Sequence, residues 1–137
     1  MVPELRVRTR AKLMVLDFSG SADRIMEVLK VTPTRTWRAG DLVTPRTKHT
    51  MKRNGWSLAS PAAESSGADE VVRELLKLFP TLEAFHGLPQ DAEVQLTISV
   101  LGHKDRPGVF LSKEVMRSIA AAGASLDIER NTPGRSL

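Results

Sequence analysis

Apolar and polar residues alternate along the beginning of the chain. The alternation runs from Leu5 to Val15, and both sets of positions become largely apolar between Leu13 and Phe18. The intervening polar positions are basic, namely Arg6, Arg8, Arg10 and Lys12. A period of two residues is typical of a β-strand that buries one face. We therefore predict a first strand that passes from an exposed, basic beginning into the interior of a sheet.

Three further stretches indicate strands. The clearest covers residues 93–100, in which every second residue is aliphatic and the others are polar. Residues 56–59 follow a turn signal at Asn54-Gly55 and predict a short strand. Leu126 and Ile128 mark a final short strand, with polar residues between and beside them.

Apolar residues at helical spacing separate these strands. The first helix is predicted at residues 22–30, with the hydroxyl of Ser21 as its N-cap. The second follows Ser66, which we expect to cap it. Pro80 bends or restarts this second helix, and Gly87 ends it.

A third helix is expected to begin at the cap Ser112 and to close at Gly123. Its inward-facing residues are predicted to be Val115, Met116, Ile119 and Ala120. Strands and helices thus alternate along the whole chain, with a loop from Gly102 to Gly108 before this helix.

The strands predicted here have one polar and one apolar face, so helices should cover one face of the sheet and water the other. We predict an α+β domain: a two-layer sandwich with a mainly antiparallel or mixed sheet and its helices on one face. A ferredoxin-like arrangement of these elements stays open. Residues 1–130 are expected to form a single domain, and residues 131–137 are expected to fray.

Composition limits the chemistry that the chain can perform. Among its 137 residues there is no cysteine, which excludes disulfides, thiolate metal sites and a cysteine nucleophile. The three histidines, His49, His86 and His103, are too far apart in sequence for a paired-histidine metal motif. We therefore expect neither a metal ion nor another cofactor.

The apolar runs of the sequence also predict where the protein is located. Residues 1–6 lack the apolar segment of a secretory signal, and no apolar run approaches the roughly 20 residues that a membrane span requires. With the absence of cysteine, this favours a cytoplasmic protein without a membrane partner.

Charge is unevenly distributed along the chain. Residues 1–56 hold 12 Lys and Arg against 5 Asp and Glu, a net charge of +7, whereas residues 57–137 hold 8 against 11, a net charge of −3. Such a chain can attract an acidic partner to one surface. Alternatively, the two parts neutralise each other in the fold.

The basic residues concentrate in a long connection at residues 31–55, which shows no clear periodicity and has room for an additional strand. Connections of this length are usually functional or disordered. Two tryptophans flank it, and indole and guanidinium groups are typical of interface hot spots. The candidate binding residues are Arg35, Trp37, Arg38, Asp41, Arg53 and Trp56. The alternative is that each indole anchors one end of the connection to the core.

A second hypothesis assigns nucleic-acid binding to the basic stripe of the first strand. Same-face residues of a strand lie about 6.6–6.8 Å apart, close to the phosphate spacing of an extended single strand. The residues concerned are Arg6, Arg8, Arg10 and Lys12. The chain has no tyrosine, so side chains that could stack on bases are scarce. The alternative is that these charges keep an exposed strand soluble.

A third hypothesis is an enzyme that acts on a small anionic substrate, with Asp17, Asp41 or His103 as the proton-transfer group. The sequence contains no phosphate-binding loop, no dinucleotide fingerprint and no nucleophile elbow. A turn or helix-capping role is commoner for an acid placed like Asp17. The residues therefore favour a binding protein over an enzyme.

Two segments carry a resemblance to a known family. They are Pro33-Thr34-Arg35-Thr36-Trp37-Arg38-Ala39-Gly40-Asp41 and Asn54-Gly55-Trp56-Ser57-Leu58. They resemble the Pro-Thr-x-x-Trp-x-x-Gly-Asp and Gly-Trp-Ser motifs of the bacterial family known as domain of unknown function 4279, over about residues 8–130. The resemblance implies the same order of elements and an ordered connection, but no activity or cofactor. It points to Thr34, Trp37, Gly40, Asp41 and Trp56 as positions to test.

These observations lead to one principal hypothesis. We expect a small bacterial binding module that recognises another protein through the basic, tryptophan-flanked connection.

Overall fold

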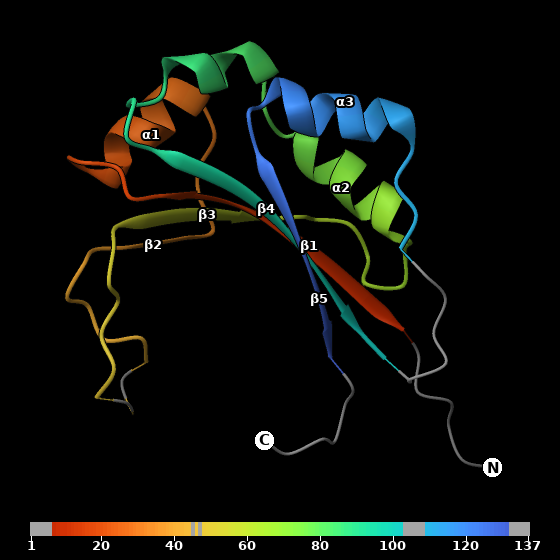
Figure 1. The fold of residues 1–137 in the computed structure, drawn as a ribbon, viewed down its shortest axis with the longest axis horizontal. Coiled ribbons are helices and arrows are strands. Elements are labelled where there is room, and N and C mark those ends of the chain that lie inside the picture. The colour runs from red at the N-terminus through yellow and green to blue at the C-terminus, as the bar shows by residue number, and fades with distance from the viewer. Residues whose placement is uncertain (1–6, 45, 47, 103–108, 132–137) are drawn as a thin grey trace.

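The computed structural model describes residues 7–44, 46, 48–102 and 109–131. Figure 1 shows two layers, with the helices gathered over one face of a five-stranded sheet. The elements follow in the order β1 (Arg8–Leu16), α1 (Ala22–Leu29), β2 (Arg35–Trp37), β3 (Gly55–Ala59), α2 (Ala68–Leu76), the 3-10 helix η1 (Leu82–Gly87), β4 (Glu93–Leu101), α3 (Lys113–Ala121) and β5 (Ser125–Asn131). The predicted α+β two-layer sandwich is confirmed.

The strands are arranged in the order β2-β3-β1-β4-β5. Neighbouring strands run antiparallel except β4 and β5, which are parallel, so the sheet is mixed as predicted. The elements β4, α3 and β5 form a β-α-β unit. By contrast, β1 precedes α1, and its sheet neighbour β3, which follows α1 and β2 in the chain, is antiparallel to it. A ferredoxin-like β-α-β-β-α-β order would instead need two such crossover units.

The central strand β1 separates the two faces of the sheet. Its buried residues Thr9, Ala11, Leu13 and Val15 lie under the helices, and Leu16 at the end of the strand is also buried. Its exposed residues Arg8, Arg10 and Lys12 lie on the other face, which we call the open face. The alternation predicted from the sequence is thus the division between a helix-covered core and a solvated surface. Leu5 and Arg6, the first residues of the predicted strand, lie outside the described residues.

Only one of the three predicted caps accepts the expected hydrogen bond. The Ser112 hydroxyl accepts a hydrogen bond from the Val115 N–H at 3.2 Å. Ser21 precedes α1, but its side chain makes no capping bond. The prediction for Ser66 is wrong: Gly67 is the N-cap of α2, and Ser66 belongs to a preceding turn in which its N–H donates to the Ala63 carbonyl at 2.9 Å.

The inward face of α3 also differs from the prediction. The helix buries Val115 and Ile119, with Ala122 following at its end, and this stripe of positions four and three residues apart faces the core. Met116 and Ala120 each lie one residue, or about 100°, further round the helix. Both are therefore exposed, with Met116 at 51%.

The last strand is longer than predicted. It continues to Asn131, which was expected to belong to the frayed tail. Leu126 and Ile128 point toward the helix-covered side, but each remains 42% exposed. The remaining tail, residues 132–137, and most of the predicted loop, residues 103–108, lie outside the described residues.

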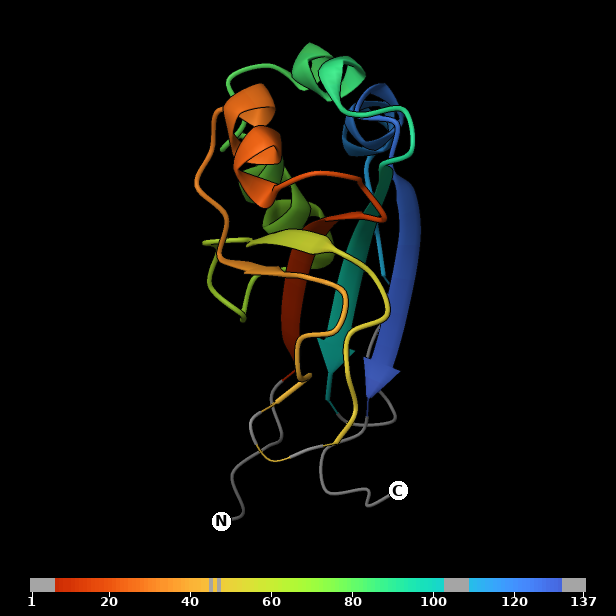
Figure 2. The same cartoon turned by 90° about the vertical axis from the view of Figure 1, so that its left-hand side faces the viewer.

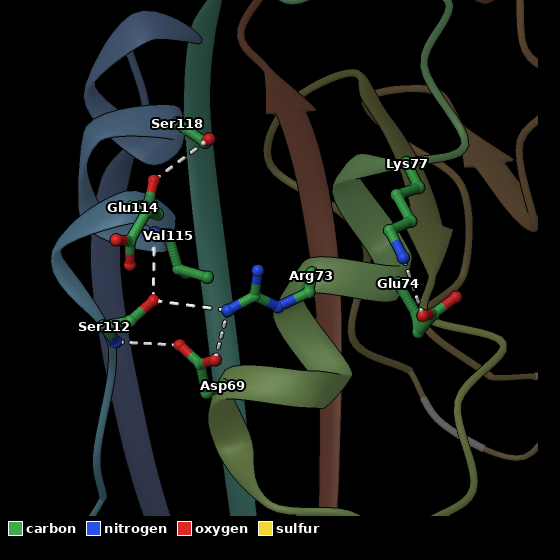
Figure 3. Close-up of polar contacts among 8 residues, drawn as sticks. All are labelled: Asp69, Arg73, Glu74, Lys77, Ser112, Glu114, Val115 and Ser118. Carbon is green, nitrogen blue, oxygen red and sulfur yellow. Dashed lines mark hydrogen bonds and ion pairs between the residues drawn. The ribbon is translucent and has the colours of Figure 1, made fainter.

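The beginnings of α2 and α3 are held together by one carboxylate (Figure 3). Asp69 pairs with Arg73 of its own helix at 2.8 Å and accepts a hydrogen bond from the Ser112 N–H at 2.7 Å. These two contacts hold the pKa of Asp69 below its usual value, because both stabilise the charged carboxylate. The cap of one helix is therefore tied to the first turn of the other.

Candidate functional site

The basic connection between β2 and β3 forms an arm, a name we use for residues 38–54. Figure 2 shows its two segments, orange and yellow, running side by side away from the helical layer. An antiparallel bridge joins Leu42 and Thr50. Backbone hydrogen bonds also run from Gly40 to Met51, from Met51 to Asp41 and from Val43 to His49, with N···O distances of 2.8, 2.7 and 2.9 Å. The described part of the arm is therefore a hydrogen-bonded hairpin, and β2 is the additional strand for which the sequence left room.

The base of the arm is set by a close contact between Trp37 and Gly55, which are directly opposed in the β2–β3 pair. A Cβ atom at Gly55 would lie 2.0 Å from Trp37 Cε2 and Cζ2. The indole therefore occupies the space that any side chain on Gly55 would need. This contact requires glycine before Trp56 and fixes the ring of Trp37 against β3.

Hydrogen bonds also hold the base of the arm in place. The Asp41 carboxylate accepts a hydrogen bond from the Arg38 N–H at 2.8 Å. The Ala39 N–H donates to Asn54 Oδ1 at 3.0 Å, and Asn54 Nδ2 donates to the Phe18 carbonyl at 2.9 Å. The two segments of the arm are thereby attached to each other and to the chain that follows β1.

Thr34 completes the attachment on the outer edge of the sheet. Its N–H donates to the Ser57 carbonyl at 2.7 Å, and its hydroxyl accepts a hydrogen bond from the Ala59 N–H at 2.9 Å. A side-chain oxygen thus replaces a backbone acceptor where the β2–β3 ladder begins.

Two of the candidate arginines are engaged by the protein itself. The Arg35 guanidinium carbon lies 5.4 Å from the centroid of the Trp37 ring, and its Nη2 donates to the Val43 carbonyl at 3.2 Å. Arg53 pairs with Asp17 at 2.6 Å and with Glu93 at 3.1 Å. The hydrogen bond that Arg53 donates to Asp17 is the main cause that raises the pKa of Arg53. Both arginines therefore hold the arm in position.

Four other cations of the arm are free. The side chains of Arg38, Arg46, Lys48 and Lys52 are exposed, and within the described ranges none of them forms an ion pair or a side-chain hydrogen bond. Arg38 was a predicted site residue, whereas Arg46, Lys48 and Lys52 were not among the candidates. Their signal in the sequence was a run of basic residues without an intervening acid.

The two tryptophans differ in exposure. Trp56 is completely buried on the helix-covered side of β3, and its Nε1 has no hydrogen-bond partner. Trp37 is half-buried at the base of the arm. Trp56 thus anchors the end of the connection to the core, as the alternative interpretation of the sequence held. Trp37 is the indole that a ligand could touch.

A pocket of about 380 Å³ opens beside the base of the arm. It lies between the beginning of α1, at Ser21 and Asp23, and the turn that carries Arg38 and Asp41. Exposed backbone N–H groups at a helix start and a guanidinium group both suit a carboxylate ligand. The carboxylates of Asp23 and Asp41 also line the pocket, so it carries both signs of charge.

The basic stripe of β1 is only partly available for a ligand. Arg8 and Lys12 are exposed on the open face, and neither has a partner among the residues that the structure describes. Arg10 forms an ion pair with Glu64. Arg6, the fourth residue of this alternative site, lies outside the described residues.

The acids suggested for proton transfer are engaged in contacts that position the arm. Asp17 pairs with Arg53 and has a positive φ of 63°, and Asp41 closes the turn at Arg38. His103 lies outside the described residues. Among the described residues, no group of three or more histidine and acidic side chains could hold a metal ion. None of the described helices has the length and apolar character needed to cross a membrane.

Comparison with known families gives a match over nearly the whole chain. The sequence profile of the family described as "Domain of unknown function (DUF4279)" matches residues 7–132, a range that includes the sheet, its helices and the arm. Neither the curated proteins nor the solved structures contain a chain that matches this sequence.

Proposed function

We propose that this chain, which belongs to the DUF4279 family, is a recognition module that binds an acidic surface of another protein through its arm. The contact would comprise the four free cations Arg38, Arg46, Lys48 and Lys52, with Trp37 at the base. Within the described residues none of these four charges forms an ion pair, so they stabilise no observed contact of the fold. This is the observation that carries the proposal.

The backbone of the arm supports the same proposal. Hydrogen bonds between its two segments, and the contacts of Asn54 and Trp37 at its base, hold the hairpin before any partner arrives. A surface that is already ordered loses less conformational entropy on binding than a flexible loop does. Charged groups on such a surface also accelerate association with an oppositely charged partner.

Trp37 supplies the less polar centre of the contact, and the adjacent pocket supplies polar groups beside it. The indole is half-buried, and Arg35 stacks on it. Aromatic and arginine side chains at the centre of an interface contribute much of its binding energy. A carboxylate side chain of the partner could enter the pocket beside Arg38 and the beginning of α1.

The test compares two variants in affinity capture from the native host, followed by titration with the purified partner. In the arm variant, Arg38, Arg46, Lys48 and Lys52 are replaced by glutamine. In the control variant, Arg24, Lys30, Lys113 and Arg117, which are exposed on the helical layer, are replaced by glutamine. We expect the arm variant to lose at least about tenfold in affinity, because each exposed charge pair contributes a few tenths to about 1 kcal/mol. The control variant should bind as the wild type does.

The proposal fails if both variants bind alike, or if Trp37→Ala and Arg38→Ala leave the affinity unchanged. Nucleic acid is the competing ligand, since Arg8 and Lys12 are free on the open face, the side toward which the arm extends. Titration of single- and double-stranded DNA and RNA at low salt distinguishes the two. Binding that weakens steeply with salt, and more so when Arg8 and Lys12 are present than when they are replaced by glutamine, would favour nucleic acid over protein.

A further inference from the structure

The outer edge of β5 is a second surface that the fold leaves open. β5 stands at one end of the sheet order, and no described residue pairs with its outer edge. The strand is seven residues long, from Ser125 to Asn131. An exposed edge of this length offers backbone N–H and C=O groups to another extended chain.

The side chains of β5 give this edge two different flanks. On the helix-covered side, Leu126 and Ile128 are each 42% exposed, and Met116 of α3, the helix that precedes β5, is 51% exposed. On the open face, Asp127 and Glu129 alternate with them. The contact between Glu129 and the Ser99 hydroxyl, at 3.3 Å, leaves its negative charge unbalanced. One flank of the edge is therefore apolar at Leu126 and Ile128, with the exposed Arg130 beyond them, and the other flank is acidic.

We propose that the outer edge of β5 binds an extended segment of another protein in which basic residues alternate with aliphatic ones. The segment would join the sheet beside β5 through backbone hydrogen bonds. Its Lys or Arg side chains would lie opposite Asp127 and Glu129, and its aliphatic side chains would lie opposite Leu126 and Ile128. Opposite charges directly across a strand pair are favourable, and aliphatic side chains that meet across two strands bury apolar surface.

A second copy of this chain fits the same edge poorly. Two β5 strands related by a two-fold axis can pair antiparallel about Asp127, Ile128 or Glu129. These registers place Asp127 against Asp127, Asp127 against Glu129, and Glu129 against Glu129 of the other copy. Like charges directly opposite each other destabilise a strand pair. The charges that attract a basic segment therefore discourage self-association at this edge.

This surface is separate from the arm. β2, which leads into the arm, and β5 are the two opposite ends of the sheet. The arm is basic and would bind an acidic partner, whereas the β5 edge would bind a basic segment. Failure of one proposal therefore leaves the other unaffected.

The test uses synthetic eight-residue peptides and two-dimensional NMR of the labelled full chain. A peptide of alternating lysine and valine should shift the backbone signals of β5, and a peptide of alternating glutamate and valine should bind at least about tenfold more weakly. In the variant with Asp127→Lys and Glu129→Lys the preference should reverse. Glu27→Lys with Glu83→Lys, two exposed acids of the helical layer, is the matched control and should keep the wild-type preference.

Two peptides with N-methyl groups test the backbone pairing without changing the protein. One carries them on the lysines and the other on the valines. Because alternate residues of an added strand direct their N–H groups toward the sheet, one of the two should lose binding and the other should retain it. Equal binding of both, shifts that map to the arm or to β1, or binding of the two charge types alike would overturn the proposal. A dimer in sedimentation that dissociates on Asp127→Lys would overturn it in favour of a second copy.

Discussion

At the base of the arm, the indole of Trp37 packs directly against Gly55 and leaves no room for a Cβ atom there. Both residues belong to the segments 33–41 and 54–58, on which the predicted resemblance to the family rests. The other motif residues have comparable tasks in the fold: Thr34 accepts from Ala59, Asp41 accepts from Arg38, and Gly40 adopts a positive φ of 95° that favours glycine. The motif therefore builds the arm, and the free cations lie at positions that the motif does not specify.

Gly55→Ala should destabilise the protein by about 1–3 kcal/mol, because its Cβ would meet the Trp37 ring at 2.0 Å and the ring must move. Urea unfolding followed by circular dichroism measures the change. The penalty should fall when Gly55→Ala is made in a Trp37→Leu background, since the smaller side chain vacates the space. Gly87→Ala is the control, because its nearest neighbour would be Val28 Cγ1 at 3.4 Å. A Gly55→Ala effect no larger than that of Gly87→Ala would contradict the proposed contact.

Single residues were predicted well where a local pattern decides their role. The alternation of β1 and the cap at Ser112 depend on residues close in sequence, and both are observed. Trp37 and Trp56 could not be distinguished in this way, because their exposure depends on which strands lie beside them. Arg53 was predicted to bind a ligand, and its ion pair with Glu93 could not be predicted because Glu93 is 40 positions away in the sequence.

At the scale of elements, Asp69 joins α2 to α3 through Arg73 and the Ser112 N–H. No local pattern predicts this contact, since its partners belong to helices separated by η1 and β4. The arm was unpredictable for a related reason. β2 has three residues, too few to show a period, and the hairpin is formed by backbone hydrogen bonds that carry no side-chain pattern.

Asp69→Asn should lower the free energy of unfolding by about 1 kcal/mol at neutral pH, through the loss of charge-assisted hydrogen bonds at a partly exposed position. The pKa of Asp69 is depressed in the folded state below its ordinary value of 3.8. The stabilisation is therefore complete above the unfolded pKa and is lost as pH falls through the folded pKa. The difference between wild type and variant should be constant above about pH 5 and shrink below about pH 4.

Urea unfolding at several pH values measures this dependence. Glu74→Gln is the matched control, since Glu74 forms an exposed pair with Lys77 at 3.3 Å on the same helix. Its effect should stay within about 0.5 kcal/mol at every pH. A wild-type advantage over Asp69→Asn that grows as the solution is acidified would contradict the role given to Asp69.

At the scale of the whole molecule, the two oppositely charged parts of the sequence neutralise each other only in part. Arg10 pairs with Glu64, and Arg53 pairs with Glu93, so both contacts join the basic first part to the acidic second part. The free cations of the arm remain at one end of the sheet, while Asp127 and Glu129 lie on β5 at the other. The sequence composition revealed the imbalance, but its distribution in space follows from the strand order.

Strand order also predicts where the structure opens most readily. β1 and β4 have paired strands on both sides, and Leu13 and Leu96 at their centres are completely buried. The arm is held by a few exposed backbone hydrogen bonds outside the sheet. In hydrogen–deuterium exchange, amides of the arm should exchange at least about 100-fold faster than those of β1 and β4. Equal protection of the arm and β1 would mean that the arm is part of the cooperative core.

The two indoles provide an optical readout of this division. The sequence has two tryptophans and no tyrosine, so near-ultraviolet absorption is dominated by Trp37 and Trp56. Trp56 is enclosed in the core, whereas Trp37 is half-exposed beside a guanidinium group. Emission of the unmodified protein therefore combines a short-wavelength component from the core with a longer-wavelength component from the arm. A ligand that occupies the arm should quench the second component and leave the first, so that binding and unfolding are separable in one spectrum without an added dye.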